Sequence, residues 1–374
     1  MTDNKPFFRA DQVGSLLRPQ YLLDARERYH AGEIDHDALR EIEDQAIAEI
    51  VKFQEGIGLK AVVDGEFRRK NWWQDFIESM ENVEIHEGDE RDAFVSDPEN
   101  DWHYVPKDVK TVGRLGVDTS RMVREWRYLD SCTDRTTKIT LPSPTRMHFH
   151  GGRRNISADA YPDVEDFFND VARLYREQIA ALEDAGARYL QIDDPLLTYF
   201  CSDRLKDRLR DQGDDPDAML ERYVQLVNDC IRDRRADTQI GIHLCRGNSR
   251  SSWISEGGYE KISKQVFPNL KVDALFLEYD DPERSGSFEP LADVPQDRKV
   301  VLGLVTTKKA DLEAKDGLKR RLDEAGKYVD LENCAISPQC GFASVVEGNI
   351  ITVDDERRKL DLVVETAEDV WGTI

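Results

Sequence analysis

The chain has 374 residues, a formal net charge of −23 and a hydrophobic content of 39%. This length suits one large domain or two smaller ones. The strong negative charge argues against nucleic acid or an anionic membrane surface as a partner, because both would be repelled. No apolar run approaches the roughly 18 residues that a membrane-spanning helix needs, so we expect no membrane span.

The N-terminus and the cysteines both indicate a cytoplasmic location. The opening residues, MTDNKPFFRADQ, lack the basic and apolar regions of a secretory signal. The six cysteines do not have the spacing of a disulfide framework; they are Cys132, Cys201, Cys230, Cys245, Cys334 and Cys340. We therefore expect a reduced, cytoplasmic protein, and the sequence leaves open whether it forms homo-oligomers.

Units of helix followed by strand recur along the chain. Apolar residues at helical spacing predict helices over 36–55, 164–187 and 216–234, and glycines end the first two. Short apolar runs between such helices predict buried parallel strands. The predicted strands span residues 8–14, 60–65, 137–142, 188–193, 239–245, 273–279, 299–305 and 334–338.

Eight such units predict an α/β fold, a single (β/α)8 TIM barrel over residues 1–374. An open doubly wound sheet is the alternative, but no glycine-rich dinucleotide motif supports it. Roughly seventy residues separate the second and third strands, far more than a usual connection. We predict an ordered insertion over about 80–135, between strands two and three and near the mouth of the barrel.

Polar residues gather at the C-terminal ends of the predicted strands, where barrel enzymes carry their chemistry. Polar groups placed by chance would fall at both ends of the strands. In chain order, the candidate site residues are Gly14, Ser15, Glu66, Asp193, His243, Cys245, Arg246, Glu278 and Cys340.

A metal site is the first hypothesis for four of these residues. His243 and Cys245 lie two residues apart, so both can face the same side of an extended strand. Glu278 and Cys340, at the ends of other strands, can converge with them. Nitrogen, sulfur and oxygen donors together suit Zn²⁺. The alternative is a core histidine beside buried free cysteines.

Other residues leave structural alternatives open. The pair His148 and His150 has no adjoining cysteine, and we expect it in a loop or at the surface. Glu66 and Asp193 can bind an α-ammonium group, or they can pair with nearby arginines. Arg246 can bind a carboxylate or a sulfonate, or it can pair with an acidic neighbour.

Three tryptophans are further candidates. Trp72, Trp73 and Trp253 could stack on a flat methyl donor such as a pterin. Plain packing in the protein interior is the more usual role of a tryptophan.

These residues resemble those of the cobalamin-independent methionine synthase family, in its C-terminal catalytic barrel. The stretches VGSLLRP, DGE, QIDDP, HLC and SPQCG match the family in order over nearly the whole chain. The resemblance implies a TIM barrel with zinc held by His243, Cys245, Glu278 and Cys340. It also implies that Ser15, Glu66 and Asp193 bind the amino acid head of homocysteine.

The resemblance implies a zinc-dependent methyltransferase that methylates a homocysteine-like thiol to form methionine or a related thioether. We assign catalytic roles to Glu278, as the ligand that an incoming sulfur displaces, and to Asp193. Gly14, Ser15, Glu66, Asp193 and Arg246 are the expected substrate-binding residues. The methyl donor stays open between methyl-tetrahydrofolate and a corrinoid-type donor.

Two departures from the family leave other readings open. The chain has no room for the family's second, N-terminal barrel, and the family's histidine after strand seven is replaced by LVTTKK, with Lys308 near the matching position. A short, single-barrel branch is therefore the better match. That branch borders the epoxyalkane:coenzyme M transferases, so alkyl transfer to a zinc-bound thiol is the main alternative. A zinc hydrolase and a non-enzymatic zinc-binding barrel are weaker ones.

Overall fold

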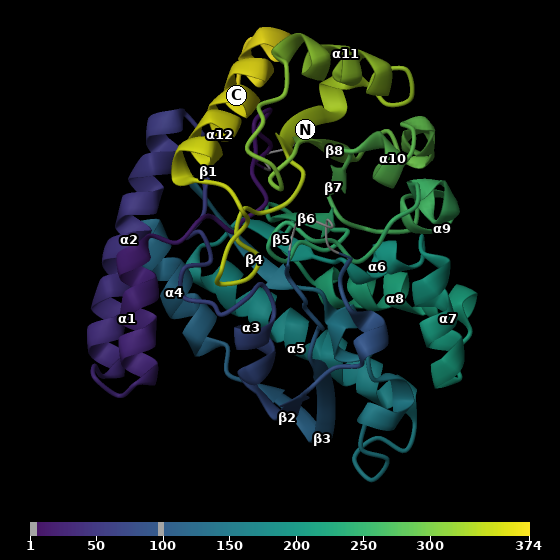
Figure 1. Ribbon diagram of the computed structural model, residues 1–374. Coiled ribbons are helices and arrows are strands. Elements are labelled where there is room, and N and C mark those ends of the chain that lie inside the picture. Colours follow the sequence, from purple (N-terminus) through teal and green to yellow (C-terminus); the bar gives the residue numbers. More distant parts are fainter. Residues whose placement is uncertain (1–5, 96–100) are drawn as a thin grey trace.

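A parallel β-sheet forms the centre of the computed structural model, which describes residues 6–95 and 101–374. The sheet has seven strands in the order β1-β4-β5-β6-β7-β8-β9, so each strand pairs with the next one of the sheet along the chain. It curls around the loops at its centre (Figure 1). The strands are β1 (Ala61–Val62), β4 (Thr136–Pro142), β5 (Tyr189–Asp193), β6 (Gln239–Leu244), β7 (Ala274–Glu278), β8 (Lys299–Val305) and β9 (Cys334–Pro338).

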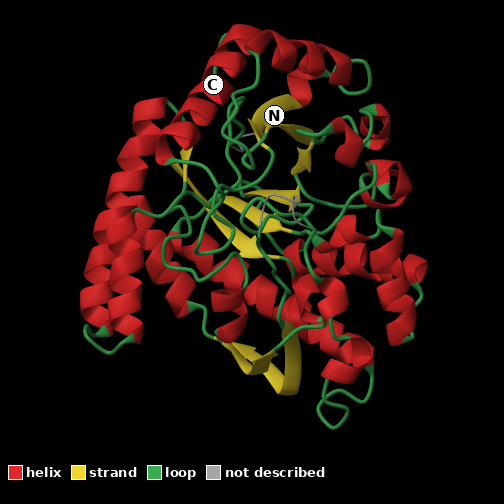
Figure 2. Ribbon diagram, in the orientation of Figure 1, coloured by secondary structure: helices red, strands yellow, loops and turns green. Residues whose placement is uncertain are grey.

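Helices surround the sheet on its outside (Figure 2). They are α1 (Gln20–His30), α2 (His36–Ile57), α3 (Gln74–Glu78), α4 (Ser120–Ser131), α5 (Val164–Ala185), α6 (Leu196–Tyr199), α7 (Asp203–Gln212), α8 (Pro216–Ile231), α9 (Ser263–Val266), α10 (Pro282–Ser285), α11 (Lys315–Ala325) and α12 (Val353–Trp371). No helix in the described part of the chain is long and apolar enough to cross a bilayer.

The three helices predicted from apolar spacing are present as α2, α5 and α8. Each begins after an aspartate, Asp35, Asp163 or Asp215, whose side chain accepts a backbone N–H of the first turn. Gly58 ends α2 with a φ of 109°, a conformation that favours glycine. Their buried faces cover the strands, which explains why the strands are continuous apolar runs.

The predicted strand over 8–14 is not a regular strand, and this part of the prediction is wrong. Its one ladder contact is an isolated parallel bridge between Ala10 and Ile336 of β9. The Gln12 carbonyl accepts a hydrogen bond from the Lys138 ammonium of β4. A side-chain donor thus takes the place of a strand N–H at this carbonyl, and the parallel sheet of the described residues has seven strands.

A hairpin separates β1 from β4 in the sequence. It consists of β2 (Met80–His86) and β3 (Asp108–Val117), which pair antiparallel and project from the lower edge in Figure 1. A 3-10 turn, η1 (Glu90–Asp92), lies in their connection. Within the predicted insertion over 80–135, the hairpin stands apart from the sheet, whereas α4 packs against α2 and α5 in the helical layer. Residues 96–100 of that insertion lie outside the described residues.

Candidate metal centre and active-site cavity

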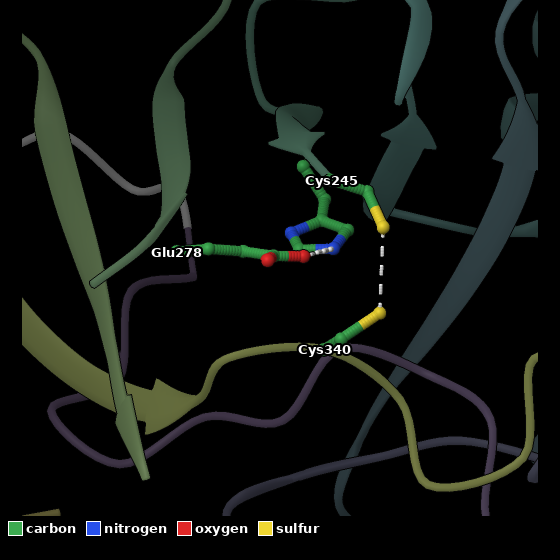
Figure 3. A group of neighbouring side chains, drawn as sticks. Cys245, Glu278 and Cys340 are labelled. Carbon is green, nitrogen blue, oxygen red and sulfur yellow. Dashed lines mark hydrogen bonds and ion pairs between the residues drawn. The ribbon is translucent and has the colours of Figure 1, made fainter. Parts of the chain in front are cut away.

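Four potential metal ligands meet at the C-terminal ends of the strands. His243 lies in β6 and Cys245 directly follows that strand, Glu278 ends β7, and Cys340 follows β9. All four side chains are buried, and their ligand atoms lie within 4.8 Å of one another. Figure 3 shows the sulfur atoms of Cys245 and Cys340 pointing toward each other, at a distance of 3.5 Å.

Several polar atoms of this cluster lack hydrogen-bond partners within the described chain. Neither ring nitrogen of His243 has one, and Nε2 lies 3.8 Å from Oε1 of Glu278, too far for a hydrogen bond. Oε1 of Glu278 accepts the Arg246 backbone N–H at 3.1 Å, but Oε2 is also unpartnered. Buried polar atoms are nearly always satisfied, and the lone pairs of an unpartnered imidazole nitrogen and carboxylate oxygen fit a bound cation.

The two cysteines are electrostatically distinct. A hydrogen bond from Cys245 holds the pKa of Cys340 well below its ordinary value, and the neighbouring His243 and Lys308 reinforce the effect. The same hydrogen bond, together with burial, raises the pKa of Cys245. Burial and the nearby Cys340 raise the pKa of Glu278. In the chain alone, one thiol thus ionises readily while the other thiol and the carboxyl hold their protons; a bound cation would favour the ionised form of all three.

A cavity opens onto this cluster. It contains about 620 Å³ of space between atoms, part of it open to solvent. His243, Cys245 and Cys340 line it, whereas Glu278 does not. The other predicted site residues in its wall are Ser15, Glu66 and Asp193.

Glu66 presents one free carboxylate oxygen. Its Oε1 accepts hydrogen bonds from Thr140 at 2.6 Å and from Arg69 at 3.2 Å, whereas Oε2 is buried without a partner in the described chain. The backbone of Glu66 has a φ of 61°, an unusual conformation for a residue other than glycine. The Asp64 side chain accepts the Glu66 N–H at 2.9 Å and Arg18 donates to the Glu66 carbonyl, which holds this turn in place.

Asp193 lies near Glu66 in the same wall. Burial, and then the charge of Glu66, raise the pKa of Asp193 to about 7. Gln191 donates to Oδ1 of Asp193 at 2.7 Å. The predicted arginine pairing is present at one oxygen of Glu66 only, so the pair of carboxylates keeps capacity for a further cationic donor.

Close backbone packing brings Ser15 to the cavity. A Cβ on Gly341 would lie 2.0 Å from Oγ of Ser15, so only glycine fits between Ser15 and Cys340. Oγ of Ser15 also accepts the Ala343 N–H at 3.4 Å. Gly14 is not in the cavity wall; a Cβ there would lie 2.8 Å from Cγ2 of Thr140, so its part is to allow the close approach to β4.

Arg246 does not line the cavity. Its guanidinium lies 4.3 Å from the centre of the Tyr259 ring, and Nη1 donates to the Gly257 carbonyl at 2.6 Å. The link to the site runs through the backbone N–H that Glu278 accepts. The structure thus places the Arg246 side chain away from the wall where the other predicted substrate-binding side chains lie.

His148 and His150 lie in the turn after the 3-10 helix Pro144–Met147, as the loop alternative predicted, but both are buried, so the surface alternative is wrong. His150 lines the cavity, and its Nδ1 lies 3.2 Å from Oδ2 of Asp92 in the hairpin connection. Asp92, Asp108 and His150 are close enough to hold a metal, but Arg208 already places a cation 3.3 Å from Asp92. An ion-pair cluster explains this group without a metal.

Aromatic side chains form much of the remaining wall, and sequence reasoning found only part of it. The aromatic lining residues are Trp72, Trp73, Phe94, Tyr104 and Tyr199; Trp253 is not among them. Phe94 and Tyr104 come from the connection between β2 and β3. No sequence pattern pointed to them, because their position depends on how that connection folds back over the strand ends.

Fold and site together define an α/β protein with a thiol-rich candidate metal site in a cavity at the strand ends. The family model described as "Cobalamin-independent synthase, Catalytic domain" matches residues 8–368. The chain belongs to the cobalamin-independent methionine synthase family, a family of methyltransferases, as its motifs predicted.

The similar proteins differ in length and in what is known of them. The uncharacterized protein YxjG of Bacillus subtilis (strain 168) is 42% identical over 373 residues, which cover 98% of this chain and 96% of that protein. A 5-methyltetrahydropteroyltriglutamate–homocysteine methyltransferase of Bacillus mycoides (strain KBAB4) is 23% identical; the match covers 90% of this chain but only 40% of that enzyme.

Solved structures share the fold. A protein of Listeria monocytogenes, assigned to the vitamin-B12 independent methionine synthases, has a TM-score of 0.77 and 35% identity, with 98% of this chain and 99% of that chain covered. A B12-independent methionine synthase of Shewanella sp. W3-18-1, in complex with selenomethionine, has a TM-score of 0.72 and 19% identity, with 98% of each chain covered.

Proposed function

We propose that this protein is a zinc-dependent methyltransferase that methylates the sulfur of homocysteine or a similar thiol, forming methionine or a related thioether. The observation that carries the proposal is the combination of two neighbouring features at one cavity. The first is a cluster of one imidazole, two thiols and one carboxylate with unpartnered polar atoms. The second is the buried pair Glu66 and Asp193 beside it, in which an arginine pairs with only one oxygen of Glu66.

His243, Cys245, Glu278 and Cys340 would hold the zinc ion, since nitrogen, sulfur and oxygen donors are its usual ligands. A free thiol has a pKa of about 8.5, and a bound zinc ion would supply the deprotonation that makes the substrate sulfur a nucleophile at neutral pH. Two cysteine ligands favour a thiol over an activated water, which argues against a hydrolase. Glu278 keeps the Arg246 N–H as a partner, so we assign it as the exchangeable ligand.

The carboxylate pair indicates which thiol binds. Oε2 of Glu66 and the carboxylate of Asp193 can accept hydrogen bonds from an α-ammonium group. The ammonium would supply a positive charge beside the two carboxylates. Ser15 lies on the other side of the Cys340 turn, where its hydroxyl can contact the α-carboxylate. A sulfonated thiol such as coenzyme M would place an anion beside these carboxylates, so alkyl transfer to coenzyme M is the second candidate.

The aromatic wall supports a flat methyl donor that enters the cavity. Trp72 and Tyr104 can cover its faces and exclude water from the reacting sulfur. Arg146 also lines the cavity, and its buried Nη1 has no partner among the described residues, so it can donate to an oxygen of the donor. Methyl-tetrahydrofolate fits this description, whereas a corrinoid would have to present its methyl group at the mouth.

We further propose that residues 8–14 complete a (β/α)8 barrel, in which the β2–β3 hairpin is an insertion. Ala10 bridges β9 on one side, and the Leu16 N–H bonds the Gly65 carbonyl, just after β1, on the other. The six cysteines are all free, which suits a reducing compartment such as the cytoplasm.

A product assay tests the proposed function. The zinc-loaded protein is incubated with homocysteine or coenzyme M, and with methyl-tetrahydrofolate, methylcobalamin or a methylated sulfonium donor. We expect methionine from homocysteine with at least one donor, and no thioether from coenzyme M. Formation of S-alkyl coenzyme M alone would replace the proposal with its second candidate, and no thioether in any combination would overturn both.

A further inference from the structure

Lys308 occupies an unusual position close to the candidate metal centre. It follows β8, and its side chain is buried, with the residue 8% exposed. Its ammonium donates to three oxygens of one segment, residues 247–252: the Gly247 carbonyl at 3.3 Å, Oδ1 of Asn248 at 3.0 Å and the Ser252 carbonyl at 3.4 Å. All three acceptors are uncharged, although burying an ammonium is costly.

The segment that Lys308 holds contacts the surroundings of both cysteine ligands. The Gly247 N–H donates to the sulfur of Cys245 at 3.2 Å. The side-chain amide of Asn248 donates to the carbonyl of Gly341, directly after Cys340, at 2.7 Å. One ammonium therefore connects the loop behind Cys245 with the turn that carries Cys340.

Close packing restricts the backbone of residues 247–252, and the end of β8 contacts the Cys340 turn as well. Gly247 has a φ of 87°, and a Cβ there would lie 2.6 Å from Cγ2 of Ile254, so the backbone is closely packed. Thr307, the residue before Lys308, also donates to the Gly341 carbonyl, at 3.2 Å. The end of β8 is thus the common support of both cysteine loops.

Charge supports the same role. Burial lowers the pKa of Lys308 and Arg284 adds to this effect, whereas the nearby Glu278, Cys340 and Asp280 favour its protonated form. Two thiolates and one carboxylate around a divalent cation leave one excess negative charge. The hydrogen-bond acceptors of the nearby Lys308 ammonium in the described chain are all neutral oxygens, so its positive charge has no counterion among them and can offset that excess.

We propose that Lys308 is a positioning residue of the metal centre: it fixes residues 247–252 so that Cys245 and Cys340 are held in ligand geometry, and its charge stabilises the anionic ligand set. The inference rests on the metal centre of the proposed function, but not on the identity of the methyl donor or on methyl transfer itself.

The test is a measurement of zinc affinity by competition with a chelator, which needs no turnover. Lys308→Met removes the ammonium, Lys308→Arg keeps the charge with a different shape, and Lys309→Met removes the exposed neighbouring lysine as the matched control. Partners that orient metal ligands typically contribute about 10- to 100-fold in affinity, so we expect a loss in that range for Lys308→Met. We expect a smaller loss for Lys308→Arg and none for Lys309→Met.

Asn248→Ala provides a second route, because it cuts the link between Lys308 and the Gly341 carbonyl. It should weaken zinc binding in the same direction, with unchanged circular dichroism in the metal-free protein. Wild-type zinc affinity in both Lys308→Met and Asn248→Ala would overturn the inference. A wild-type protein that binds zinc but transfers no methyl group would overturn the proposed function alone, and one that binds no zinc would overturn both.

Discussion

Two buried polar clusters lie inside the same sheet, and they differ in how completely they are paired. At one, the Lys138 ammonium bonds Asp11 at 2.8 Å and Gln191 at 3.1 Å, and the Tyr189 hydroxyl donates to the other Asp11 oxygen. At the other, around His243 and Glu66, several donors and acceptors have no partner in the described chain. The side chains of the first cluster are all paired within the described chain, whereas those of the second leave atoms available to a bound ion or ligand.

This difference separates a structural role from a functional one. Both clusters are buried and both contain charged groups, so neither burial nor charge distinguishes them. The pairing of their own side chains does: Lys138, Asp11 and Tyr189 leave no polar side-chain atom unpartnered, whereas His243, Glu278 and Glu66 each do. Changes in the first cluster should therefore reduce stability, and changes in the second should reduce binding and catalysis.

The largest effect is expected for Cys340→Ser. Loss of one thiolate should remove zinc and lower the methyl-transfer rate by at least about 1,000-fold, since the substrate sulfur is no longer activated. Zinc content by elemental analysis and the rate of methionine formation check this. Cys334→Ser is the matched control, because Cys334 is a buried cysteine of β9 outside the ligand set. Stoichiometric zinc and normal turnover in Cys340→Ser would contradict the account.

Lys138→Met should break the structural cluster. It leaves the Asp11 carboxylate buried without its counterion, which typically costs about 3–5 kcal/mol of folding free energy. Denaturant unfolding of the metal-free protein measures the change, with Lys309→Met as the exposed control. The protein that remains folded should bind zinc with wild-type affinity; a selective loss of zinc at unchanged stability would remove the distinction between the clusters.

Asp193→Asn should affect substrate binding more than metal binding. Loss of a charge-assisted hydrogen bond to the α-ammonium should raise the KM for homocysteine by about 10- to 100-fold, with a smaller change in kcat. Steady-state kinetics at saturating donor, together with zinc content, separate the two. If KM for homocysteine stays at the wild-type value, the carboxylate pair does not bind the ammonium.

The same variant should change the pH dependence of stability. Burial and Glu66 raise the pKa of Asp193 to about 7 in the folded chain, from an ordinary 3.8. Because the unfolded chain ionises this group more readily, Asp193 lowers stability progressively as the pH rises from about 4 through 7. Metal-free Asp193→Asn should therefore gain on the order of 2 kcal/mol relative to wild type at pH 8 and little at pH 4, as measured by urea unfolding.

The smallest effect is expected for Trp72→Leu in the aromatic wall. Loss of one stacking surface should raise the KM for the methyl donor by about 3- to 10-fold and leave the KM for homocysteine unchanged. Trp253→Leu, which lies outside the cavity wall, is the control. Equal effects of the two variants on donor binding would show that packing, rather than stacking on the donor, explains the change.

The four potential ligands could be found from the sequence because each one lies at or just after an apolar run that forms a strand. Chain order then places His243, Cys245 and Cys340 at the same edge of the sheet. The position of His150 could not be found this way, because Asp92 reaches it from a hairpin 58 residues earlier in the chain. The side-chain direction of Arg246 depends on the Tyr259 ring, which the local sequence does not reveal.

The strand predicted over 8–14 shows why an apolar pattern alone does not establish a regular strand. Its apolar residues predicted a ladder, but polar side chains of β4 and β5 bond its carbonyls and take the place of strand amides. Periodicity describes which side chains are buried, and it does not identify the group that satisfies each backbone carbonyl.

Zinc K-edge X-ray absorption tests the central claim most directly, because it counts sulfur atoms bound to the metal. For the zinc-loaded protein, the account predicts two sulfur ligands, from Cys245 and Cys340, and a third on addition of homocysteine. An unchanged count of two sulfur ligands with homocysteine bound, or a site without sulfur in the resting protein, would contradict it.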